Sequence, residues 1–255
     1  EKCHDTAPAT PNDHMYPYVG KLVHNLNWSQ LQTLSCDKKL ADFPGQKVAK
    51  DNRMIQLKDV FDIVKKYGAE KDIYYNIETK VEADDHSKSA EPKEFVDAIM
   101  GAVKDAGVQD KVMIQSFDWR TFPLMKDVAP EVPLVMLYDE TTWLKDSKWT
   151  GDVNYDDVNG DVIKAAKKLG VQVLSPGYTN PYGLLPGQKD YKLVADKKFI
   201  DAAHKEGLRV VPWTIDNKDV LAQQIEAGAD GIITDYPTML RKVMKDKGLS
   251  LSLIH

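Results

Sequence analysis

Residues 73–80 read Ile73-Tyr74-Tyr75-Asn76-Ile77-Glu78-Thr79-Lys80, an apolar, β-prone run that ends in a carboxylate and an ammonium group. Side chains alternate between the two faces of a strand, so Glu78 and Lys80 point to one face while Ile77 and Thr79 point to the other. In α/β barrels the active site lies at the carboxyl ends of the strands. An anionic ligand beside a phosphate-seeking cation at such an end predicts a metal-assisted phosphate-ester site.

Helical and strand-like segments alternate from residue 57 onward. Apolar residues recur at helical spacing, and these stretches stop at glycines such as Gly107 and Gly170. Residues 1–56 are expected to be irregular apart from one short amphipathic piece near 28–34. The expected helices lie at 57–68, 95–106, 119–128, 159–169, 197–206, 217–227 and from 237, and the expected strands at 73–79, 112–117, 133–138, 171–176, 208–213 and 231–235.

This alternation is typical of an α/β fold with a parallel sheet. Six strands are expected, whereas a closed (β/α) barrel needs eight. A doubly wound sheet of six strands fits the count equally well, although no glycine-rich turn follows an early strand to support a dinucleotide fold. Periodicity alone leaves both architectures open.

Composition and length narrow the classes of protein. A chain of 255 residues suits one domain over 1–255, and single α/β barrels often have this size. The net charge of −5 argues against a binder of nucleic acid or of anionic membranes. No apolar run of about 18 residues is present, so no membrane span is expected. The chain begins with Glu1 and shows no leader, which indicates a processed product or a piece of something longer.

Two cysteines, Cys3 and Cys36, both lie in the irregular N-terminal segment. A disulfide between them would stabilise the fold by about 3–4 kcal/mol through loop closure and would imply an exported protein. Two unrelated thiols are the alternative. The Pro-rich, aromatic surroundings at 15–20 favour the disulfide because an irregular loop gains most from such a link.

Four short motifs follow the strands in order: Asn76-Ile77-Glu78-Thr79-Lys80, Gln115-Ser116-Phe117-Asp118, Val211-Pro212-Trp213-Thr214, and the run from Gly228 to Pro237. Together they resemble the glycerophosphodiester phosphodiesterase family, which has a TIM-barrel fold. The resemblance covers most of residues 55–245. The segment 2–36 also resembles the exported bacterial or fungal branch of that family, which implies a secreted or cell-envelope location.

The resemblance implies a reaction and roles for two residues. Glu78 corresponds to a ligand of the family's divalent cation, Ca²⁺ or Mg²⁺, and Lys80 to the lysine that contacts the substrate phosphate. In the family, the metal polarises the phosphoryl oxygens and two histidines act as general acid and base. The implied partner is a small glycerophosphodiester, which is hydrolysed to sn-glycerol 3-phosphate and an alcohol.

Further candidates follow from the same resemblance. Gln115, Phe117 and Trp213 are expected to line the pocket, with Trp213 packed against the glycerol portion. Tyr178, in the loop after the strand at 171–176, is a weaker candidate for substrate binding. Asp235 ends the last expected strand, and we expect it to cap the following helix.

The chain departs from the family at its start. The family's opening His-Arg-Gly, Pro-Glu-Asn and Glu-x-Asp motifs are absent, and they would supply a catalytic histidine and two metal ligands. His4-Asp5 resembles the family's next motif, a His-Asp pair, which makes His4 a catalytic candidate; an exposed loop histidine is the alternative. We therefore expect a TIM barrel that lacks its first two strands and is nearly inactive by itself.

Two other functions stay open. A barrel glycoside hydrolase would need a second carboxylate about 5–10 Å from Glu78, for which Asp139, Glu140 and Asp235 are the choices. An exported binding protein on a decayed barrel is the other possibility. The sequence does not indicate an oligomeric state.

Overall fold

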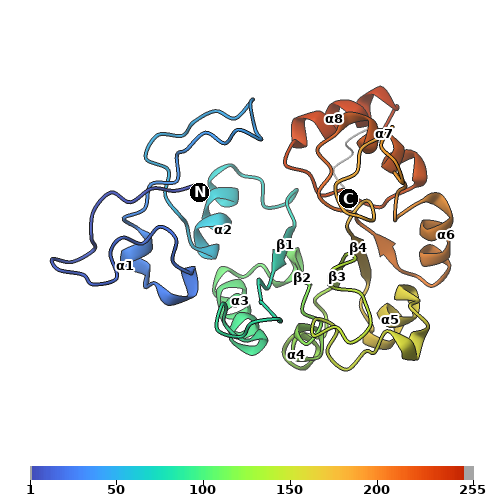
Figure 1. Ribbon diagram of the computed structural model, residues 1–255, viewed down its shortest axis with the longest axis horizontal. Coiled ribbons are helices and arrows are strands. Elements are labelled where there is room, and N and C mark those ends of the chain that lie inside the picture. Colours follow the sequence, from blue (N-terminus) through green and yellow to red (C-terminus); the bar gives the residue numbers. More distant parts are fainter. Residues whose placement is uncertain (1, 250–255) are drawn as a thin grey trace.

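The computed structural model describes residues 2–249 as alternating helices and parallel strands (Figure 1). The helices are α1 (Trp28–Leu31), α2 (Leu57–Lys66), α3 (Pro92–Ala106), α4 (Thr121–Val128), α5 (Val162–Leu169), α6 (Lys197–Lys205), α7 (Lys218–Ala227) and α8 (Pro237–Asp246), with short 3₁₀ turns at Val23–Asn25, Gln109–Lys111 and Asp156–Val158. The strands are β1 (Tyr75–Glu78), β2 (Val112–Ser116), β3 (Leu134–Tyr138), β4 (Val173–Pro176) and β5 (Arg209–Val210). None of the described helices is both long enough and apolar enough to cross a membrane.

The strands form one sheet whose spatial order is the order of the chain, β1-β2-β3-β4-β5. Every neighbouring pair is parallel, and Glu78 of β1 lies in register with Gln115 of β2. A doubly wound sheet reverses its strand order at a switch point, whereas a barrel does not. The unreversed order confirms the barrel-type prediction and removes the doubly wound alternative.

The last two expected strands differ from the prediction. Only Arg209–Val210 of the expected 208–213 is a strand, and residues 231–235 do not form one. The sheet is nevertheless continued by the N–H of Ile233, which donates to the carbonyl of Pro212, and by the carbonyl of Ile233, which accepts from Ile215. Pro212 has no N–H to donate, which interrupts the regular ladder at this point.

The main core lies between the outer face of the sheet and the helices that cover it. Val103 of α3, Ile114 of β2, Met136 of β3 and Leu174 of β4 are fully buried there. Gly107 ends α3 in the left-handed conformation (φ 68°), which glycine adopts without steric cost. This packing fixes the strands and therefore the loops that leave their carboxyl ends.

The N-terminal segment, residues 2–56, has a small core of its own around Tyr18, Leu31 and Leu34. The predicted disulfide between Cys3 and Cys36 is present. In Figure 1 this segment lies beyond α2, on the side of the molecule opposite α6. The loop that carries Phe43 contacts the C-terminal part of the chain. The Phe43 ring stacks on that of Tyr236 with centroids 6.0 Å apart.

Candidate active site

Glu78 and Lys80 meet at the carboxyl end of β1, as the alternation of strand side chains predicts. Lys80 Nζ donates to Glu78 Oε1 at 3.1 Å, and it also lies 5.9 Å from the centre of the Phe117 ring. The Lys80 side chain is 78% exposed, whereas that of Glu78 is 26% exposed. An ammonium group is therefore presented to solvent beside a partly covered carboxylate.

The opposite face of the same strand end is anchored by buried hydroxyl groups. Thr79 Oγ1 donates to Ser116 Oγ at 2.7 Å and lies 3.1 Å from Thr121 Oγ1. Asp118, the last residue of the Gln115–Asp118 motif, is fully buried. Its carboxylate accepts from Nε of the Arg120 guanidinium at 2.9 Å. These contacts hold the ends of β1 and β2 in a fixed relationship.

Aromatic rings form a wall beside the Glu78–Lys80 pair. The Phe117 ring makes edge-to-face contacts with Trp213 at 5.3 Å and with Trp149 at 6.2 Å between centroids. The Trp213 indole donates to the Ser175 carbonyl at 2.9 Å, and the Trp149 indole donates to Asp84 at 3.0 Å. Each indole is thus held by a hydrogen bond to another segment, Trp213 to strand β4 and Trp149 to the loop after β1.

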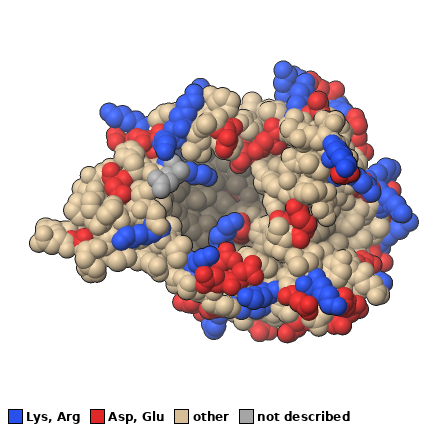
Figure 2. Space-filling model, in the orientation of Figure 1, with Lys and Arg blue, Asp and Glu red and all other residues tan. Residues whose placement is uncertain are grey.

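A cavity of about 420 Å³ opens at this strand end, and we call it the Glu78 cavity. The side of the molecule seen in Figure 2 is deeply hollowed between the N-terminal segment and the strands. The residues that line the Glu78 cavity are Leu22, Glu78, Lys80, Val81, Glu82, Lys88, Ser89, Phe117, Asp139, Thr141, Thr142 and Trp149. The N-terminal segment thus contributes Leu22 to a cavity that the strand ends otherwise form.

Three of the predicted residues lie near this cavity without lining it. Gln115 Oε1 accepts from the Asn76 amide at 2.9 Å, across the β1–β2 pair. Trp213 lies behind Phe117. Tyr178 is buried and packs on Tyr182, whose ring in turn packs on Trp213 at 4.9 Å. Tyr178 therefore supports the aromatic wall. Direct contacts of Gln115, Trp213 and Tyr178 with a substrate stay predictions.

His4 is not brought to the Glu78 cavity. Its backbone pairs with Ser35, and its Nδ1 lies 3.4 Å from Asp37 Oδ1. Both partners belong to the N-terminal segment, and the side chain is 57% exposed. These contacts are those of an exposed loop histidine, so a catalytic role for His4 stays a prediction without geometric support.

The described residues do not fit a divalent cation by themselves. Between residues 2 and 249, no three His, Cys, Asp or Glu side chains gather closely enough to hold a metal ion. Ca²⁺ and Mg²⁺ need about six oxygen ligands, with several supplied by protein. Glu78, the predicted ligand, is paired with Lys80 instead.

Sequence reasoning missed Trp149 as a residue of this cavity and named Asp139 only as a carboxylate for the glycoside hydrolase alternative. Asp139 directly follows β3, so its place at a strand end was a usable signal. Trp149 lies within the long loop after β3, and no local pattern connects it with Phe117. The prediction that Asp235 caps the last helix was wrong. The residue before α8 is Tyr236, and no side chain caps this helix.

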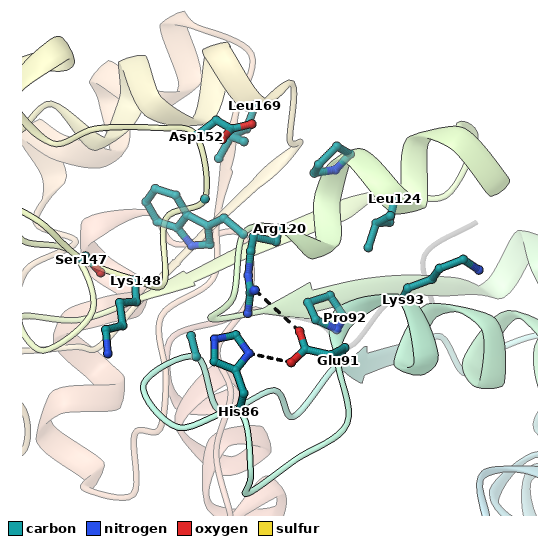
Figure 3. A pocket seen from close by; sticks show the side chains of 14 residues that line it. His86, Glu91, Pro92, Lys93, Arg120, Leu124, Ser147, Lys148, Asp152 and Leu169 are labelled. Atoms are coloured by element: carbon teal, nitrogen blue, oxygen red, sulfur yellow. Dashed lines mark hydrogen bonds and ion pairs between the residues drawn. The ribbon is translucent and has the colours of Figure 1, made fainter.

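A cavity of about 700 Å³, larger than the Glu78 cavity, is lined by other residues (Figure 3). Three of its polar side chains are paired with one another: His86 Nδ1 lies 2.6 Å from Glu91 Oε1, and Arg120 lies 3.7 Å from the same carboxylate. The hydrogen bond from His86 lowers the pKa of Glu91. None of the predicted site residues lines this cavity.

Comparison with known proteins gives related sequences and folds. A glycerophosphodiester phosphodiesterase of Caldanaerobacter subterraneus subsp. tengcongensis is 26% identical over 204 residues, which cover 80% of this chain and 67% of that protein. A dermonecrotic toxin of Loxosceles hirsuta is 36% identical over 99 residues, 37% of this chain and 34% of the toxin.

Solved structures share the fold. A Silicibacter pomeroyi DSS-3 protein of the glycerophosphoryl diester phosphodiesterase type superposes with a TM-score of 0.69 at 23% identity, over 88% of this chain and 70% of the other. An Oleispira antarctica phosphodiesterase, solved with its product sn-glycerol-3-phosphate, gives a TM-score of 0.62 at 14% identity, over 88% and 72%.

The family assignment follows from a match along almost the whole chain. The sequence model of the glycerophosphoryl diester phosphodiesterase family matches residues 3–239, a range that includes the Glu78–Lys80 strand end and the aromatic wall. The resemblance noted from the four motifs is thereby confirmed, and the chain belongs to the glycerophosphoryl diester phosphodiesterase family.

Proposed function

We propose that this chain binds and orients glycerophosphodiesters for hydrolysis to sn-glycerol 3-phosphate and an alcohol. The observation that carries the proposal is the exposed Lys80 ammonium beside Glu78 in a cavity at the strand ends. Family membership supports a phosphoric diester hydrolase, and the product complex of the Oleispira antarctica relative supports this class of substrate.

The roles of the side chains follow from their chemistry. Lys80 supplies a compact positive charge for a phosphoryl oxygen, and the ion pair with Glu78 keeps the ammonium at the strand end. Phe117 and Trp149 cover one side of the cavity with apolar surface, which suits the carbon skeleton of glycerol. Trp213 holds Phe117 in place from behind.

We further propose that Glu78 is one ligand of a divalent cation, Ca²⁺ or Mg²⁺. Residues 2–249 do not complete the ligand set of such an ion, so no catalytic step is assigned to it. The described residues contribute one predicted ligand, Glu78, and no placed histidine, so only binding and orientation are assigned to them. The disulfide supports an exported or cell-envelope location, since such bonds persist in oxidising compartments.

The experiment measures hydrolysis of glycerophosphocholine, with Ca²⁺ or Mg²⁺, by the chain and by its Glu78→Ala variant. Binding of sn-glycerol 3-phosphate is followed in parallel by NMR titration. The exposed Glu131 provides a matched control as Glu131→Ala. Specific binding that Glu78→Ala or Lys80→Ala weakens supports the proposal even where turnover is slow. Absence of saturable binding by a folded, oxidised chain would refute it.

One observation bears on the glycoside hydrolase alternative: Asp139 lines the same cavity as Glu78. Its Oδ1 already accepts from the backbone N–H and the hydroxyl of Thr141, at 2.8 and 2.6 Å. Glu140 and Asp235 do not line that cavity. Turnover of aryl glycosides that is lost in Glu78→Gln would favour this alternative, and tight glycerophosphate binding without any turnover would favour a binding protein.

A further inference from the structure

Another cavity, of about 240 Å³, lies where the loops after β3 and β4 meet, and we call it the Glu140 cavity. Aromatic side chains form much of its lining, with Trp143 and Tyr155 from the loop after β3 and Phe199 from α6. Its charged lining residues are Asp139 and Glu140, and no Lys, Arg or His lines it. The cavity is therefore both aromatic and acidic.

Two buried polar atoms at this cavity have no hydrogen-bond partner. They are the hydroxyl of Tyr138 and Oε2 of Glu140, two of only four such side-chain atoms between residues 2 and 249. Tyr138 is 5% exposed. The other carboxylate oxygen of Glu140 is used, since it accepts from the Tyr182 N–H at 2.9 Å. Each unpaired buried group destabilises the fold, and a bound hydrogen-bonding ligand would offset that loss.

The lining selects the chemistry of such a ligand. Two carboxylates without a basic neighbour favour a cation and disfavour an anion. Ring faces of Trp and Tyr attract organic ammonium groups. The unpaired Glu140 oxygen accepts only, so the ligand must carry a donor, which a primary ammonium has and a quaternary one lacks. A compact primary ammonium compound satisfies all three conditions.

The Glu140 cavity adjoins the Glu78 cavity. Asp139 lines both. Gly177 forms part of the wall of the Glu140 cavity, and a Cβ atom there would lie 3.4 Å from the Asp139 side chain and 3.7 Å from the Trp213 ring. The backbone at Gly177 therefore separates the Glu140 cavity from the aromatic residues of the predicted active site.

We propose that the Glu140 cavity binds the ammonium group of a compact primary amine. Glu140 and Tyr138 are assigned as its binding groups independently of the proposed function. Glu140 provides the charge and the acceptor, and Tyr138 provides a hydroxyl for the same group.

The first test titrates the chain with ethanolammonium chloride by NMR or calorimetry. Glu140→Gln and Tyr138→Phe should each weaken binding about tenfold, the loss expected for one hydrogen bond to a charged group. Tyr138→Phe should also raise the Tm without ligand, because it removes an unpaired buried hydroxyl. The exposed Glu131→Gln should behave as the wild type. Tetramethylammonium should bind more weakly than ethanolammonium.

The outcomes separate this proposal from the proposed function. No saturable ethanolammonium binding, or equal binding by Glu140→Gln and Glu131→Gln, would overturn the ammonium site and leave water as the occupant. Ethanolammonium binding with no hydrolysis or binding of any glycerophosphodiester would keep the site and remove the proposed function.

Discussion

The ammonium of Lys80 lies 3.1 Å from the Glu78 carboxylate and 5.9 Å from the centre of the Phe117 ring, at the carboxyl end of β1. An ion pair that is this exposed contributes little to stability, about 0–1 kcal/mol, because water and salt screen it. The pair is therefore better explained by function than by folding. A bound phosphate group would replace solvent around Lys80 without breaking any buried contact.

Replacement of Lys80 by Ala should separate binding from stability. We expect Lys80→Ala to weaken sn-glycerol 3-phosphate binding about tenfold or more, because charged hydrogen bonds are worth about 1.5–3 kcal/mol. The free energy of unfolding should change by less than about 0.5 kcal/mol. Titration and urea unfolding measure the two quantities. The exposed Lys58→Ala is the control, and equal affinities for the two variants would contradict the role of Lys80.

The buried ion pair between Asp118 and Arg120 should behave in the opposite way. Asp118 is fully buried, and besides the guanidinium it accepts from the Arg120 backbone N–H at 3.0 Å. Asp118→Ala should lower the free energy of unfolding by about 1–3 kcal/mol, because it removes the buried acceptor of the Arg120 guanidinium, which then keeps only Glu91, at 3.7 Å, among the described residues. Urea unfolding measures the loss. The exposed Asp127→Ala should cost far less, and a similar cost for both would show that the pair does not stabilise the fold.

The disulfide between Cys3 and Cys36 should stabilise the chain through its unfolded state. The two residues are 33 apart in sequence, a loop for which closure entropy predicts about 3–4 kcal/mol. The double change Cys3→Ser with Cys36→Ser should reduce the free energy of unfolding by this amount. Reduction of the wild type should give the same loss, and it should leave the double variant unaffected. A double variant as stable as the oxidised wild type would contradict the prediction.

Whereas the barrel-type strand order came from the family resemblance, local pattern was sufficient for the alternation of helices and strands along the chain and for the Glu78–Lys80 contact. Both depend on periodicity within one segment, where alternation of side chains leaves no second choice. The prediction of a strand at 231–235 was wrong, because an apolar run alone does not make a strand. A strand also needs regular partners, and Pro212 in the neighbouring segment cannot donate to it.

The rest of the candidate site depends on contacts between distant loops. The Trp149 indole is fixed by Asp84, 65 residues earlier in the chain, and no spacing rule connects the two. The Tyr178 ring packs on the Tyr182 ring and its backbone N–H donates to the Trp213 carbonyl, contacts between distant residues that the sequence did not indicate. Three of the four motifs lie at strand ends, but they do not specify which loop residues close the cavity there.

Asp235 provides a prediction for the pH dependence of stability. Burial raises the pKa of its carboxyl above the ordinary 3.8, and the nearby Asp216 carboxylate raises it further, while Lys2 opposes them. The folded state therefore binds this proton more tightly than the unfolded state does. Its contribution to stability is present at pH below about 3.8 and is lost as pH rises through the folded pKa.

Replacement of Asp235 by Asn should remove this loss at neutral pH. The backbone N–H of residue 235 would still donate to Asp216 Oδ1, a bond of 2.9 Å in the wild type, so the local structure should persist. Asp235→Asn should unfold at a higher urea concentration than the wild type at pH 7, and the gain should shrink towards pH 4. Asp246→Asn, an exposed change in α8, is the control. A gain that does not depend on pH would show that repulsion from Asp216 is not its source.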